Sequence, residues 1–486
     1  MALIFDGLFR IARGEVLVDD WSKKIYSVDA SHYEIEPAAV AFPKNEGDLQ
    51  EICRYASARY ISLTARGAGT GLLGQSLSNG GLVLDFTRHM KRVLETGDDY
   101  VIVEPGMVKG VLDRELKKRG KFLPPDPASS NYCTIGGMIA DNSSGVHCLG
   151  YGNTIDFIEG LDFVYADGNI GRSAEPDSRL SKLKNLLGPN AGLIRSSYPQ
   201  VSKNSCGYRL DATIEGGFFP HKIFAASEGT LGLVTSARLR IMDLPEYRCL
   251  MVVGFDSLLA AVSAVQVILK FSPVALEMLD STVLAHGDYH ADAGCLLFVE
   301  FAGPNRIAVE GRMEKCRSVV AGRAAAVVEY AADDQSLARI WAARKGALND
   351  IMKMTVGSRK PIGLIEDTVV PPEMLEQHAA NLLRAYRDNK LEYVMYGHVG
   401  DGNMHTRPLV DTDSKSESEM VQRLATEIFA QVILSGGTIT GEHGDGLARV
   451  GYIEAMYGNA VTALFRQVKD LLDPEHLLNP GKKVLV

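Results

Sequence analysis

Apolar residues near the start of the chain occur both at helical spacing and in short continuous runs. Between Glu46 and Tyr60 they stand three and four positions apart, which places them on one face of a helix. A second helix is expected from about Val108 to Arg119. Short apolar runs bounded by turn residues predict buried strands at residues 60–64, 81–86 and 100–103. Short elements separated by many turns indicate an α+β domain, which we place at residues 1–245.

After residue 245 the pattern becomes a regular alternation of apolar strands and amphipathic helices. Strands are predicted at residues 249–255, 294–303, 324–331 and 362–370. Helices are predicted at residues 258–271, 306–320, 335–354 and 373–389. This alternation is typical of an α/β layer, so we expect a ferredoxin-like cap domain at residues 246–437. Residues 438–486 are too few for a domain and are expected to pack back on one of the other two.

The composition is that of an ordinary globular protein. Hydrophobic residues make up 46% of the chain and charged residues 23%, so we expect a folded, water-soluble protein. The formal net charge of -9 works against binding of a phosphate backbone, which needs clustered Lys and Arg. No nucleic-acid partner is therefore expected.

The amino terminus and the cysteines bear on location. Asp6 and Arg10 interrupt the first apolar residues before a signal peptide could form. No run of about 18 apolar residues is present, so no transmembrane segment is predicted. The seven cysteines form neither a CxxC motif nor a disulfide framework. We expect a cytoplasmic protein, with any membrane contact peripheral and made through a partner.

Glycine is concentrated in the first domain, where residues 66–152 hold 15 of the 48 glycines. The segment 69–74 matches the GxGxxG pattern of nicotinamide-binding Rossmann units. However, Gly80 and Gly81 follow too soon for the long helix that such a unit needs. The glycines instead indicate a backbone free to wrap an anion with its N–H groups. Two further loops of small residues, 124–145 and 226–235, indicate a large, flat ligand that bears phosphate.

Five motifs in sequence order carry a resemblance to a known family. They are RGAGTG at 66–71, PDPAS at 125–129, TIGGMIADNSSG at 134–145, SEGTLG at 227–232 and NPGK at 479–482. Together they resemble the PCMH-type FAD-binding domain of the vanillyl-alcohol oxidase superfamily. Within it the chain is similar, from about Phe42 to Lys482, to one branch. That branch contains the D-lactate and D-2-hydroxyglutarate dehydrogenases and the flavin subunit of glycolate oxidase.

The resemblance implies a fold and a way of holding FAD. The fold would be α+β: a two-part PCMH-type FAD-binding domain, the cap domain, and a C-terminal segment that returns to the flavin domain. Some relatives link FAD to a histidine in the first loop, where this chain has Thr70, so non-covalent FAD is implied. The implied FAD-binding residues are Arg66, Gly67, Ala68, Gly69, Thr70, Gly71, Asp126, Thr134, Gly136, Gly137, Asn142, Ser144, Gly145, Glu228, Gly229 and Asn479.

Histidines and an acidic residue in glycine-rich turns are the candidates for catalysis. His398 and His405 follow the apolar run 393–396, which predicts a strand, a tight glycine turn and a second strand that bring both imidazoles together. Glu442 and His443 stand in another such turn. Single histidines of this kind are more often structural. Together, imidazole and carboxylate groups suit Zn, Mn or Fe.

The resemblance divides the roles among these four residues. It implies that His398, His405 and Glu442 bind a divalent metal, Zn or Mn with Fe as a further option, and that His443 is the catalytic base. The chemistry agrees with this division, because a metal lowers the pKa of a substrate hydroxyl and an imidazole can accept its proton near neutral pH. The flavin takes the hydride.

A hydroxy-acid substrate needs a cation for its carboxylate. Arg344 is the main candidate, because arginine binds carboxylates through two parallel hydrogen bonds, although a helix-surface arginine is often only solvated. Asn403, in the histidine turn, is a second candidate substrate contact, and Lys345 and Lys360 are weaker ones. The D-2-hydroxyglutarate enzymes have a lysine in the strand predicted here at 362–370, which this chain lacks. A contact to a second carboxylate therefore stays open.

The combined prediction is an FAD-dependent, metal-assisted dehydrogenase that converts a small D-2-hydroxy acid to the 2-oxo acid. D-Lactate, glycolate and D-2-hydroxyglutarate are the candidate substrates. Because the cysteines are not clustered, electrons are expected to leave to a separate iron–sulfur, flavoprotein or quinone acceptor. A metallohydrolase would not explain the three flavin-type loops, and a nicotinamide enzyme lacks its helix. The alternative is a flavin subunit of a larger iron–sulfur complex with little activity alone.

Overall fold

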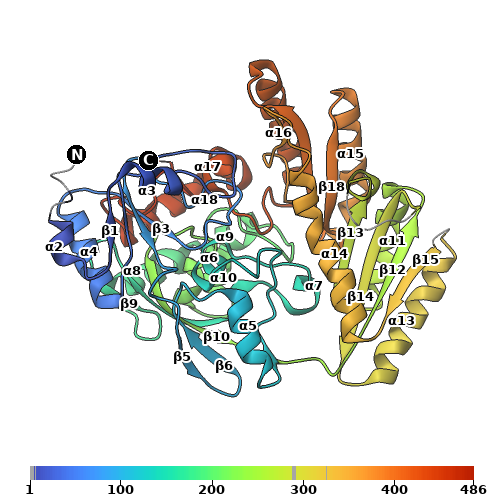
Figure 1. Cartoon of the computed structure of the whole chain (residues 1–486), viewed down its shortest axis with the longest axis horizontal. Coiled ribbons are helices and arrows are strands. Elements are labelled where there is room, and N and C mark those ends of the chain that lie inside the picture. The colour runs from blue at the N-terminus through green and yellow to red at the C-terminus, as the bar shows by residue number, and fades with distance from the viewer. Residues whose placement is uncertain (1–4, 6, 287–291, 324–325, 486) are drawn as a thin grey trace.

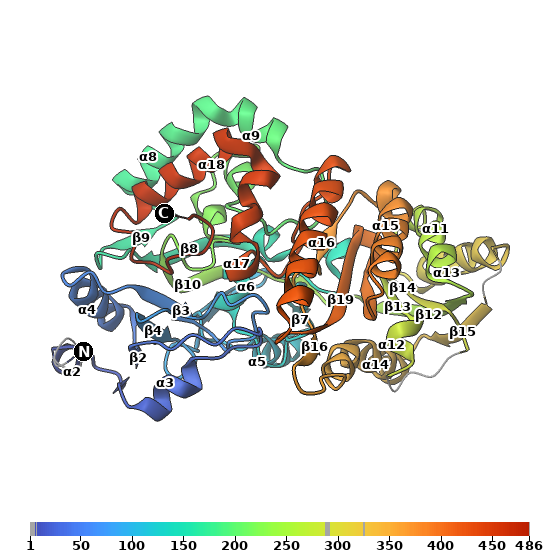
Figure 2. The same ribbon diagram turned by 90° about the horizontal axis from the view of Figure 1, so that it is seen from above.

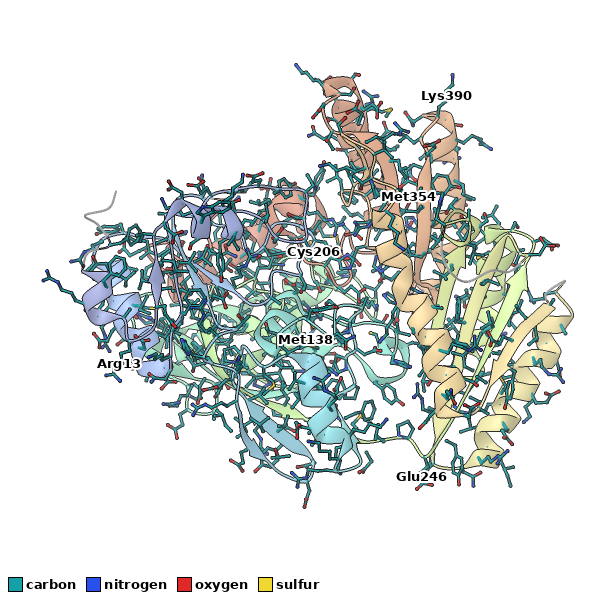
Figure 3. All side chains as sticks on the ribbon, in the orientation of Figure 1. Arg13, Met138, Cys206, Glu246, Met354 and Lys390 are labelled. Carbon is teal, nitrogen blue, oxygen red and sulfur yellow. The ribbon has the colours of Figure 1, made fainter. Side chains whose placement is uncertain are left out.

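The structure is a computed structural model that describes residues 5, 7–286, 292–323 and 326–485. It has two lobes, and both chain termini lie in the first of them (Figure 1). Glu246 marks where the chain crosses to the second lobe (Figure 3). The apolar start with Asp6 and the beginning of the strand predicted at 324–331 lie outside the described residues. Along the described chain, no helix is both long enough and apolar enough to cross a membrane.

The first lobe begins with a four-stranded sheet whose last three strands are parallel. Its order is β1 (Val16–Leu17), β2 (Ala39–Ala41), β4 (Leu82–Asp85) and β3 (Leu63–Arg66). The first predicted helix is confirmed as α4 (Glu46–Ser57), which buries its apolar face and is capped by Asn45. The strand predicted at 60–64 is β3 and begins later, because exposed Tyr60 adopts a left-handed turn conformation (φ 53°).

A five-stranded antiparallel sheet completes this lobe. Its order is β5 (Val93–Thr96), β6 (Tyr100–Val103), β10 (Leu233–Arg240), β8 (Ile158–Val164) and β9 (Ile170–Arg172). The second predicted helix is confirmed as α5 (Lys109–Lys117). No helix lies between Gly74 and β4, as expected. A short pair joins β7 (Lys121–Phe122) to β11 (Met242–Asp243).

The other helices before the crossing are short. They are α2 (Leu8–Ile11), α3 (Asp20–Tyr26), α6 (Ile135–Asp141), α7 (Cys148–Tyr151), α8 (Ser178–Leu187), α9 (Ala191–Ser197) and α10 (Leu210–Ile214). The 3₁₀ turns in the same stretch are η1 (Thr154–Asp156), η2 (Gly188–Asn190) and η3 (Pro220–Phe224). Most of the chain between the strands is therefore loop and short helix, as the many turn residues predict.

The second lobe begins with a ferredoxin-like unit, as expected. Its elements are β12 (Tyr247–Phe255), α11 (Leu258–Leu269), β13 (Ala275–Asp280), β14 (Cys295–Gly303), α13 (Arg306–Ala321) and β15 (Ala326–Ala331). The strands lie in the order β15-β12-β14-β13, all antiparallel. The helices α11 and α13 contact each other and both contact β12 and β14, so they cover one face of the sheet.

The sheet continues from β13 into the histidine-bearing hairpin. It adds β18 (Tyr393–His398), β19 (Asn403–Asp411), β16 (Arg359–Pro361) and β17 (Thr368–Val369). The predicted strand, glycine turn and strand are confirmed, with η5 (Val399–Asp401) and Gly402 (φ 70°) at the turn. The other elements of the lobe are α12 (Ser281–Leu284), α14 (Asp334–Met352), η4 (Pro372–Met374), α15 (Leu375–Asp388) and α16 (Lys415–Leu434).

The strand predicted at 362–370 is wrong over most of its length. Only Thr368 and Val369 form strand β17. The preceding residue, Asp367, has a φ of 67°, and its carboxylate accepts the backbone N–H of Gly441 and His443, both at 2.9 Å. These bonds hold the segment in a turn, so its polar pair Glu366–Asp367 points inward instead of alternating along a strand.

The C-terminal segment returns to the first lobe, as expected. Its helices are α17 (Gly446–Arg449) and α18 (Ile453–Leu472), with η6 (Val450–Tyr452) between them. Figure 2 shows α18 beside α8 and α9 of the first lobe. Beyond α18, Leu63 of β3 donates its N–H to Leu477 O at 2.7 Å and accepts from Asn479 N at 2.8 Å. The last residues thus extend the first sheet.

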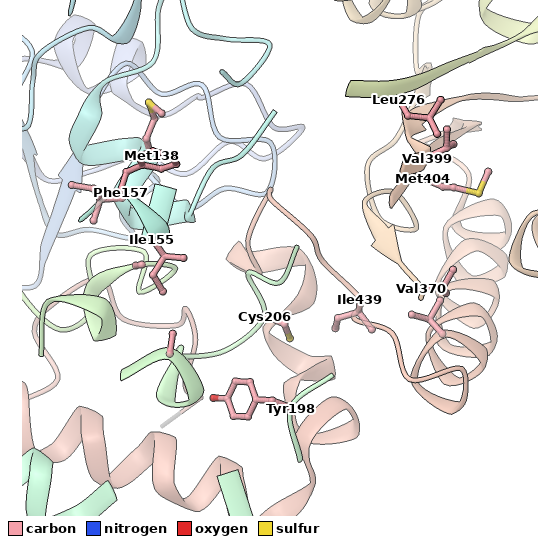
Figure 4. Packing of buried hydrophobic residues seen from close by; sticks show 14 of the residues in the cluster. Met138, Ile155, Phe157, Tyr198, Cys206, Leu276, Val370, Val399, Met404 and Ile439 are labelled. Atoms are coloured by element: carbon pink, nitrogen blue, oxygen red, sulfur yellow. The ribbon is translucent and has the colours of Figure 1, made fainter. Parts of the chain in front are cut away.

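One cluster of buried apolar side chains crosses the boundary between the lobes. It contains Met138 and Phe157 of the first lobe and Leu276 and Met404 of the second (Figure 4). A shared core fixes the lobes relative to each other, because packed interiors deform little. Groups on the facing sides of the two lobes are therefore held at defined distances.

Candidate active site

A cavity lies between the glycine loops of the first lobe and the histidine hairpin of the second. The three predicted metal ligands, His443 and Arg344 all line it. Twelve of the sixteen residues predicted to bind FAD line it as well: Arg66, Gly67, Ala68, Gly69, Thr70, Gly71, Thr134, Gly136, Gly137, Ser144, Glu228 and Gly229. Motifs more than 300 residues apart in sequence thus meet in one cavity.

Glycine is required where the loops approach one another. A methyl group on Gly67 would lie 2.2 Å from Thr134 Oγ1, and one on Gly136 would lie 2.8 Å from the Pro105 side chain. Gly69 has a φ of 66°, a conformation that other residues rarely adopt. The result is a cradle of bare backbone. Such a cradle fits a flat ligand that bears phosphate, and the residues present therefore fit FAD.

Four of the predicted FAD residues support the loops instead of lining the cavity. Asn142 ends α6 in a left-handed conformation (φ 53°) and is fully buried. Asn479 donates its amide to two backbone carbonyls, one of them that of Glu228 at 2.7 Å. Gly145 (φ 127°) passes directly against the backbone of Asp126. These contacts tie the three loops and the C-terminal segment to one another.

Three imidazoles converge on one carboxylate oxygen. Oε1 of Glu442 lies 2.9 Å from Nε2 of His398, 3.4 Å from Nε2 of His405 and 3.8 Å from Nε2 of His443. The rings of His405 and His443 stack with their centroids 4.9 Å apart, and the His398 ring stands edge-on to that of His405. The β18–β19 pairing places Tyr396 opposite His405, which brings the hairpin histidines together.

Carboxylates lie at the opposite edge of each ring and accept a hydrogen bond from two of the three. Nδ1 of His398 lies 2.7 Å from Oε1 of Glu277, and Nδ1 of His443 lies 2.8 Å from Oε1 of Glu366. Nδ1 of His405 lies 3.5 Å from the other oxygen of Glu366. Both carboxylates are fully buried. A carboxylate on Nδ1 fixes the ring orientation and leaves Nε2 to face a metal ion.

The buried charges shift the titration of these groups. Burial lowers the pKa of His443, but Glu366 and Asp367 outweigh it and raise this pKa to about 9. The pKa of Glu442 lies well below its usual range, because Lys203 and the nearest histidine lower it by more than burial raises it. Glu442 is therefore ionised at neutral pH, which is the form that binds a metal.

Two overlapping sets of side chains could hold a divalent ion. One is the predicted set of His398, His405 and Glu442. The other set keeps His405 and Glu442 and adds Asp367 and His443 in place of His398; its ligand atoms lie within 4.8 Å of one another. Asp367 is the weaker ligand, because its Oδ2 already accepts the N–H groups of residues 441–443 and a threonine hydroxyl. In the predicted set both Nε2 atoms face Oε1 of Glu442, and this combination of imidazole and carboxylate fits Zn, Mn or Fe.

Cations lie at the same end of the cavity. Arg344 of α14 is buried, with Nη2 at 2.7 Å from Oε2 of Glu277 and its guanidinium 5.4 Å from the centre of the Tyr396 ring. Its Nε has no hydrogen-bond partner within the described chain. Lys345 also lines the cavity, with Nζ 3.1 Å from Oδ2 of Asp126. Lys360 does not line it.

Asn403, the other predicted substrate contact, is fully buried and does not line the cavity. Its Nδ2 donates to Oδ1 of Asp367 and to the carbonyl of Thr368, both at 3.2 Å. Asp367 in turn holds the backbone of Glu442 and His443. In this structure Asn403 supports the turn that bears the catalytic candidates.

Sequence reasoning missed the groups behind the histidines. Glu277 had one signal, an acidic side chain between the apolar residues Leu276 and Met278 of strand β13. Glu366 and Asp367 stood in a run interpreted as a strand, where their partners could not be foreseen. Lys203, which lies 3.1 Å from Oε2 of Glu442, had no local signal, because serine and asparagine flank it as in many surface loops.

A charged bridge joins the loop at 124–145 to strand β14 of the second lobe. Nδ1 of His147 lies 3.0 Å from Oδ2 of Asp126, and its Nε2 lies 3.3 Å from Oε2 of Glu300 on β14. Trp341, one turn before Arg344 on α14, also donates to Glu300 at 2.5 Å. Burial lowers the pKa of His147, but Asp126 and Glu300 outweigh it and raise this pKa to about 10. The bridge is therefore charged at neutral pH and ties α14 to the first lobe.

Comparison with known proteins agrees with the architecture. The chain matches two family models, "FAD binding domain" over residues 37–173 and "FAD linked oxidases, C-terminal domain" over residues 244–483. It is 33% identical to D-2-hydroxyglutarate dehydrogenase of Escherichia coli over 94% of this chain and 49% of that protein. It is 32% identical to the glycolate oxidase subunit GlcD of Bacillus subtilis over 94% of this chain and 91% of that protein.

Solved structures share the fold at low sequence identity. p-Cresol methylhydroxylase with substrate bound has a TM-score of 0.72 and 16% identity, over 96% of this chain and 93% of that one. The PCMH-type fold expected from the motifs is thereby confirmed. The chain spans about half the length of the D-2-hydroxyglutarate dehydrogenase it matches.

Proposed function

Because the chain belongs to the FAD-linked oxidases, together with the D-2-hydroxyglutarate dehydrogenase and glycolate oxidase subunit described above, we propose that it dehydrogenates a small D-2-hydroxy acid. The product is the 2-oxo acid, and the electrons pass to a non-nicotinamide acceptor. One observation carries this proposal: three imidazoles, a carboxylate and an arginine meet at one end of a flavin-type cavity.

FAD is held non-covalently in this proposal. The first loop offers Thr70 where some relatives have a histidine linked to the flavin, and after Arg66 the residues of this loop that line the cavity, 67–71, are glycine, alanine and threonine. Precipitation with trichloroacetic acid is expected to release all the flavin into the supernatant. Yellow colour that stays with the protein pellet would contradict non-covalent binding.

The residues at the substrate end of the cavity have three roles: metal ligands, catalytic base and carboxylate-binding residue. His398, His405 and Glu442 hold a divalent ion, Zn or Mn with Fe as a further option. When bound, the ion lowers the pKa of the substrate hydroxyl and FAD supplies the hydride acceptor. His443 accepts the hydroxyl proton at Nε2, because Glu366 holds its Nδ1. His443 must be neutral to act as a base, and the charge of a divalent ion on the neighbouring ligand set would lower the pKa of His443 from about 9 and so favour that form.

Arg344 binds the substrate carboxylate. Its buried guanidinium lines the cavity, Nε has no hydrogen-bond partner among the described residues, and Nη2 donates to Glu277. The substrates considered are D-lactate, glycolate and D-2-hydroxyglutarate, since all three place a carboxylate next to the hydroxyl-bearing carbon. Asn403 enters this proposal only as a support of Asp367.

Two proposals concern the setting of the reaction. The electron acceptor is a separate iron–sulfur or flavoprotein subunit or a quinone. A cytoplasmic location is supported by the seven cysteines, which are all buried and free.

The second candidate function is a flavin subunit with little activity alone. It is favoured by the similarity to a protein named as a subunit. We also keep the division into residues 1–245, 246–437 and 438–486 as a proposal.

The central experiment measures metal content and flavin reduction on the same preparations. Under anaerobic conditions, one of the three acids is expected to bleach the wild-type flavin. His398→Ala, His405→Ala and Glu442→Ala are expected to lose metal and bleaching rate together while FAD stays bound. His221→Ala serves as the control with both retained, because His221 does not line the cavity. Full metal and full rate in all three ligand variants would place the site elsewhere.

A further inference from the structure

We propose that Lys203 positions Glu442 as a metal ligand by holding its Oε2, so that Oε1 faces the two ligand histidines. The inference rests on the proposed metal-assisted function. It extends that function to a residue outside every motif considered in the sequence. Lys203 is a positioning residue in this proposal, because it touches the ligand and does not reach the metal position itself.

The two oxygens of Glu442 have different partners. Oε1 faces the three imidazole Nε2 atoms, at 2.9 to 3.8 Å. Oε2 accepts from Lys203 Nζ at 3.1 Å and from the Ser144 hydroxyl. Lys203 Nζ also donates to the carbonyl of Gly145 at 3.3 Å. With Oε2 engaged by Lys203 and Ser144, Oε1 is the oxygen that faces the imidazoles and would hold an ion there.

The ammonium group of Lys203 is shielded from solvent. Its side chain is completely buried, and Glu442 is the acidic group in ion-pair contact with it. A buried ammonium without a paired carboxylate is strongly destabilising, so the pair holds both side chains in place. The position of the Glu442 carboxylate therefore depends on Lys203.

Lys203 belongs to a segment that is hydrogen-bonded to both the hairpin turn at 399–402 and the turn that bears Glu442. Ser202 donates to Asp401, between the two hairpin histidines, at 2.6 Å. Ser205 donates its hydroxyl to the carbonyl of Gly441 at 2.9 Å, and Gly207 donates its N–H to Asp445 at 2.8 Å. Figure 4 shows Cys206 of this segment close to Ile439, at the base of the Glu442 turn. Residues 202–207 thus contact the sequence before and after Glu442 as well as the histidine turn.

Lys109 offers a comparison that tests whether the effect is specific to Lys203. Lys109 is as deeply buried as Lys203 and is ion-paired with Asp113, but it lies on α5 away from the imidazoles. It serves as a matched control for the cost of removing a buried, paired ammonium. Outer contacts to a metal ligand are commonly worth about 10- to 100-fold in metal affinity. A loss specific to Lys203 is therefore measurable.

The test compares Lys203→Met, Lys203→Gln and Lys109→Met as FAD-loaded protein. Each is titrated with Zn²⁺ alone and Mn²⁺ alone against a competing chelator, and flavin content is measured beside it. Lys203→Met is expected to bind metal about 10- to 100-fold more weakly than wild type. Lys203→Gln can still donate to Oε2 but carries no charge, so its metal affinity is expected to lie between those of Lys203→Met and wild type. Lys109→Met is expected to match wild type in metal affinity.

A second measurement separates positioning from general damage. Saturating metal is expected to restore most of the flavin-reduction rate of Lys203→Met, whereas a distorted fold would not recover. Wild-type metal affinity in both the Met and the Gln variants overturns the role of Lys203 alone. A wild-type protein that binds no divalent ion at all overturns the proposed metal-assisted function first, and the two failures are thus distinct.

Discussion

The two ends of the cavity are built on different principles. At the flavin end, bare backbone and small side chains come from three loops, each continuous in sequence. At the substrate end, long charged side chains come from β13, α14, β18, β19 and the turn at 442–443. The flavin end needs space and backbone N–H groups. The substrate end needs opposing charges fixed within a few ångströms of one another.

This difference has a consequence for mutation. Loop glycines act one by one, because each prevents one clash or permits one conformation. The charged groups share partners: Glu277 holds both His398 and Arg344, and Glu366 holds both His405 and His443. Residues in one such network do not have additive effects. The predictions below, from the largest effect to the smallest, separate the two ends.

His443→Ala is expected to give the largest loss, at the substrate end. The rate of flavin reduction should fall by about 100- to 10,000-fold, the usual worth of a positioned base. Flavin content and metal content should stay at wild-type levels, because neither cradle nor ligand set is changed. Rapid-mixing reduction with the preferred acid measures the rate. Loss of the ion in this variant, with Glu442→Ala retaining it, would reverse the roles of the two neighbours.

Arg344→Ala is expected to weaken substrate binding by about 10- to 100-fold, since a lost charged hydrogen bond costs about 1.5–3 kcal/mol. The flavin spectrum should be unchanged. Steady-state measurement of KM and kcat checks this. Arg344→Lys is the matched control, because it keeps a positive charge beside Glu277 and loses only the two-pronged geometry. An unchanged KM in the alanine variant would move the carboxylate contact to Lys345.

Gly69→Ala is expected to act at the flavin end alone. A left-handed alanine costs about 1–2 kcal/mol, so FAD affinity should fall roughly tenfold while the FAD-loaded enzyme turns over at the wild-type rate. Fluorescence titration of apoprotein with FAD measures the affinity. Gly80→Ala is the control for strain, because Gly80 also has a positive φ (67°) and its added methyl would meet open space. Equal losses in both variants would argue against a role in the cradle.

His147→Gln is expected to have the smallest effect on turnover and a distinct effect on stability. The pKa of His147 is raised to about 10, so its ion pairs stabilise the fold fully below about pH 6.5. This contribution declines as the pH rises and is gone above about pH 10. Denaturant unfolding at pH 6, 8 and 10 should show that the difference in free energy of unfolding between wild type and the variant shrinks as the pH rises. A constant difference across this range would mean that the bridge is not charged.

Much of the fold follows from local sequence. The apolar spacing of 46–57 is enough for α4, and the alternation after residue 245 is enough for β12, α11, β14 and α13, because each depends on neighbours within a few positions. Strand β13 was not predicted, and the order of the strands depends on pairings between distant residues. The hairpin that carries His398 and His405 follows in the same way from its glycine turn. The flavin loops were recognisable as motifs because each is a short, continuous stretch.

Only the tertiary structure decided which charged groups surround the imidazoles. Glu277 and His398 are 121 residues apart, and Lys203 and Glu442 are 239 apart, so no local pattern connects them. They meet because β13 pairs with β18 and because segment 202–207 runs along the turn at 438–445. The error at 362–370 has the same origin, since Asp367 leaves the strand to accept N–H groups from residues 441–443. Local sequence sets backbone conformation through short-range sterics and spacing, whereas buried charges take their positions from partners that only the folded chain supplies.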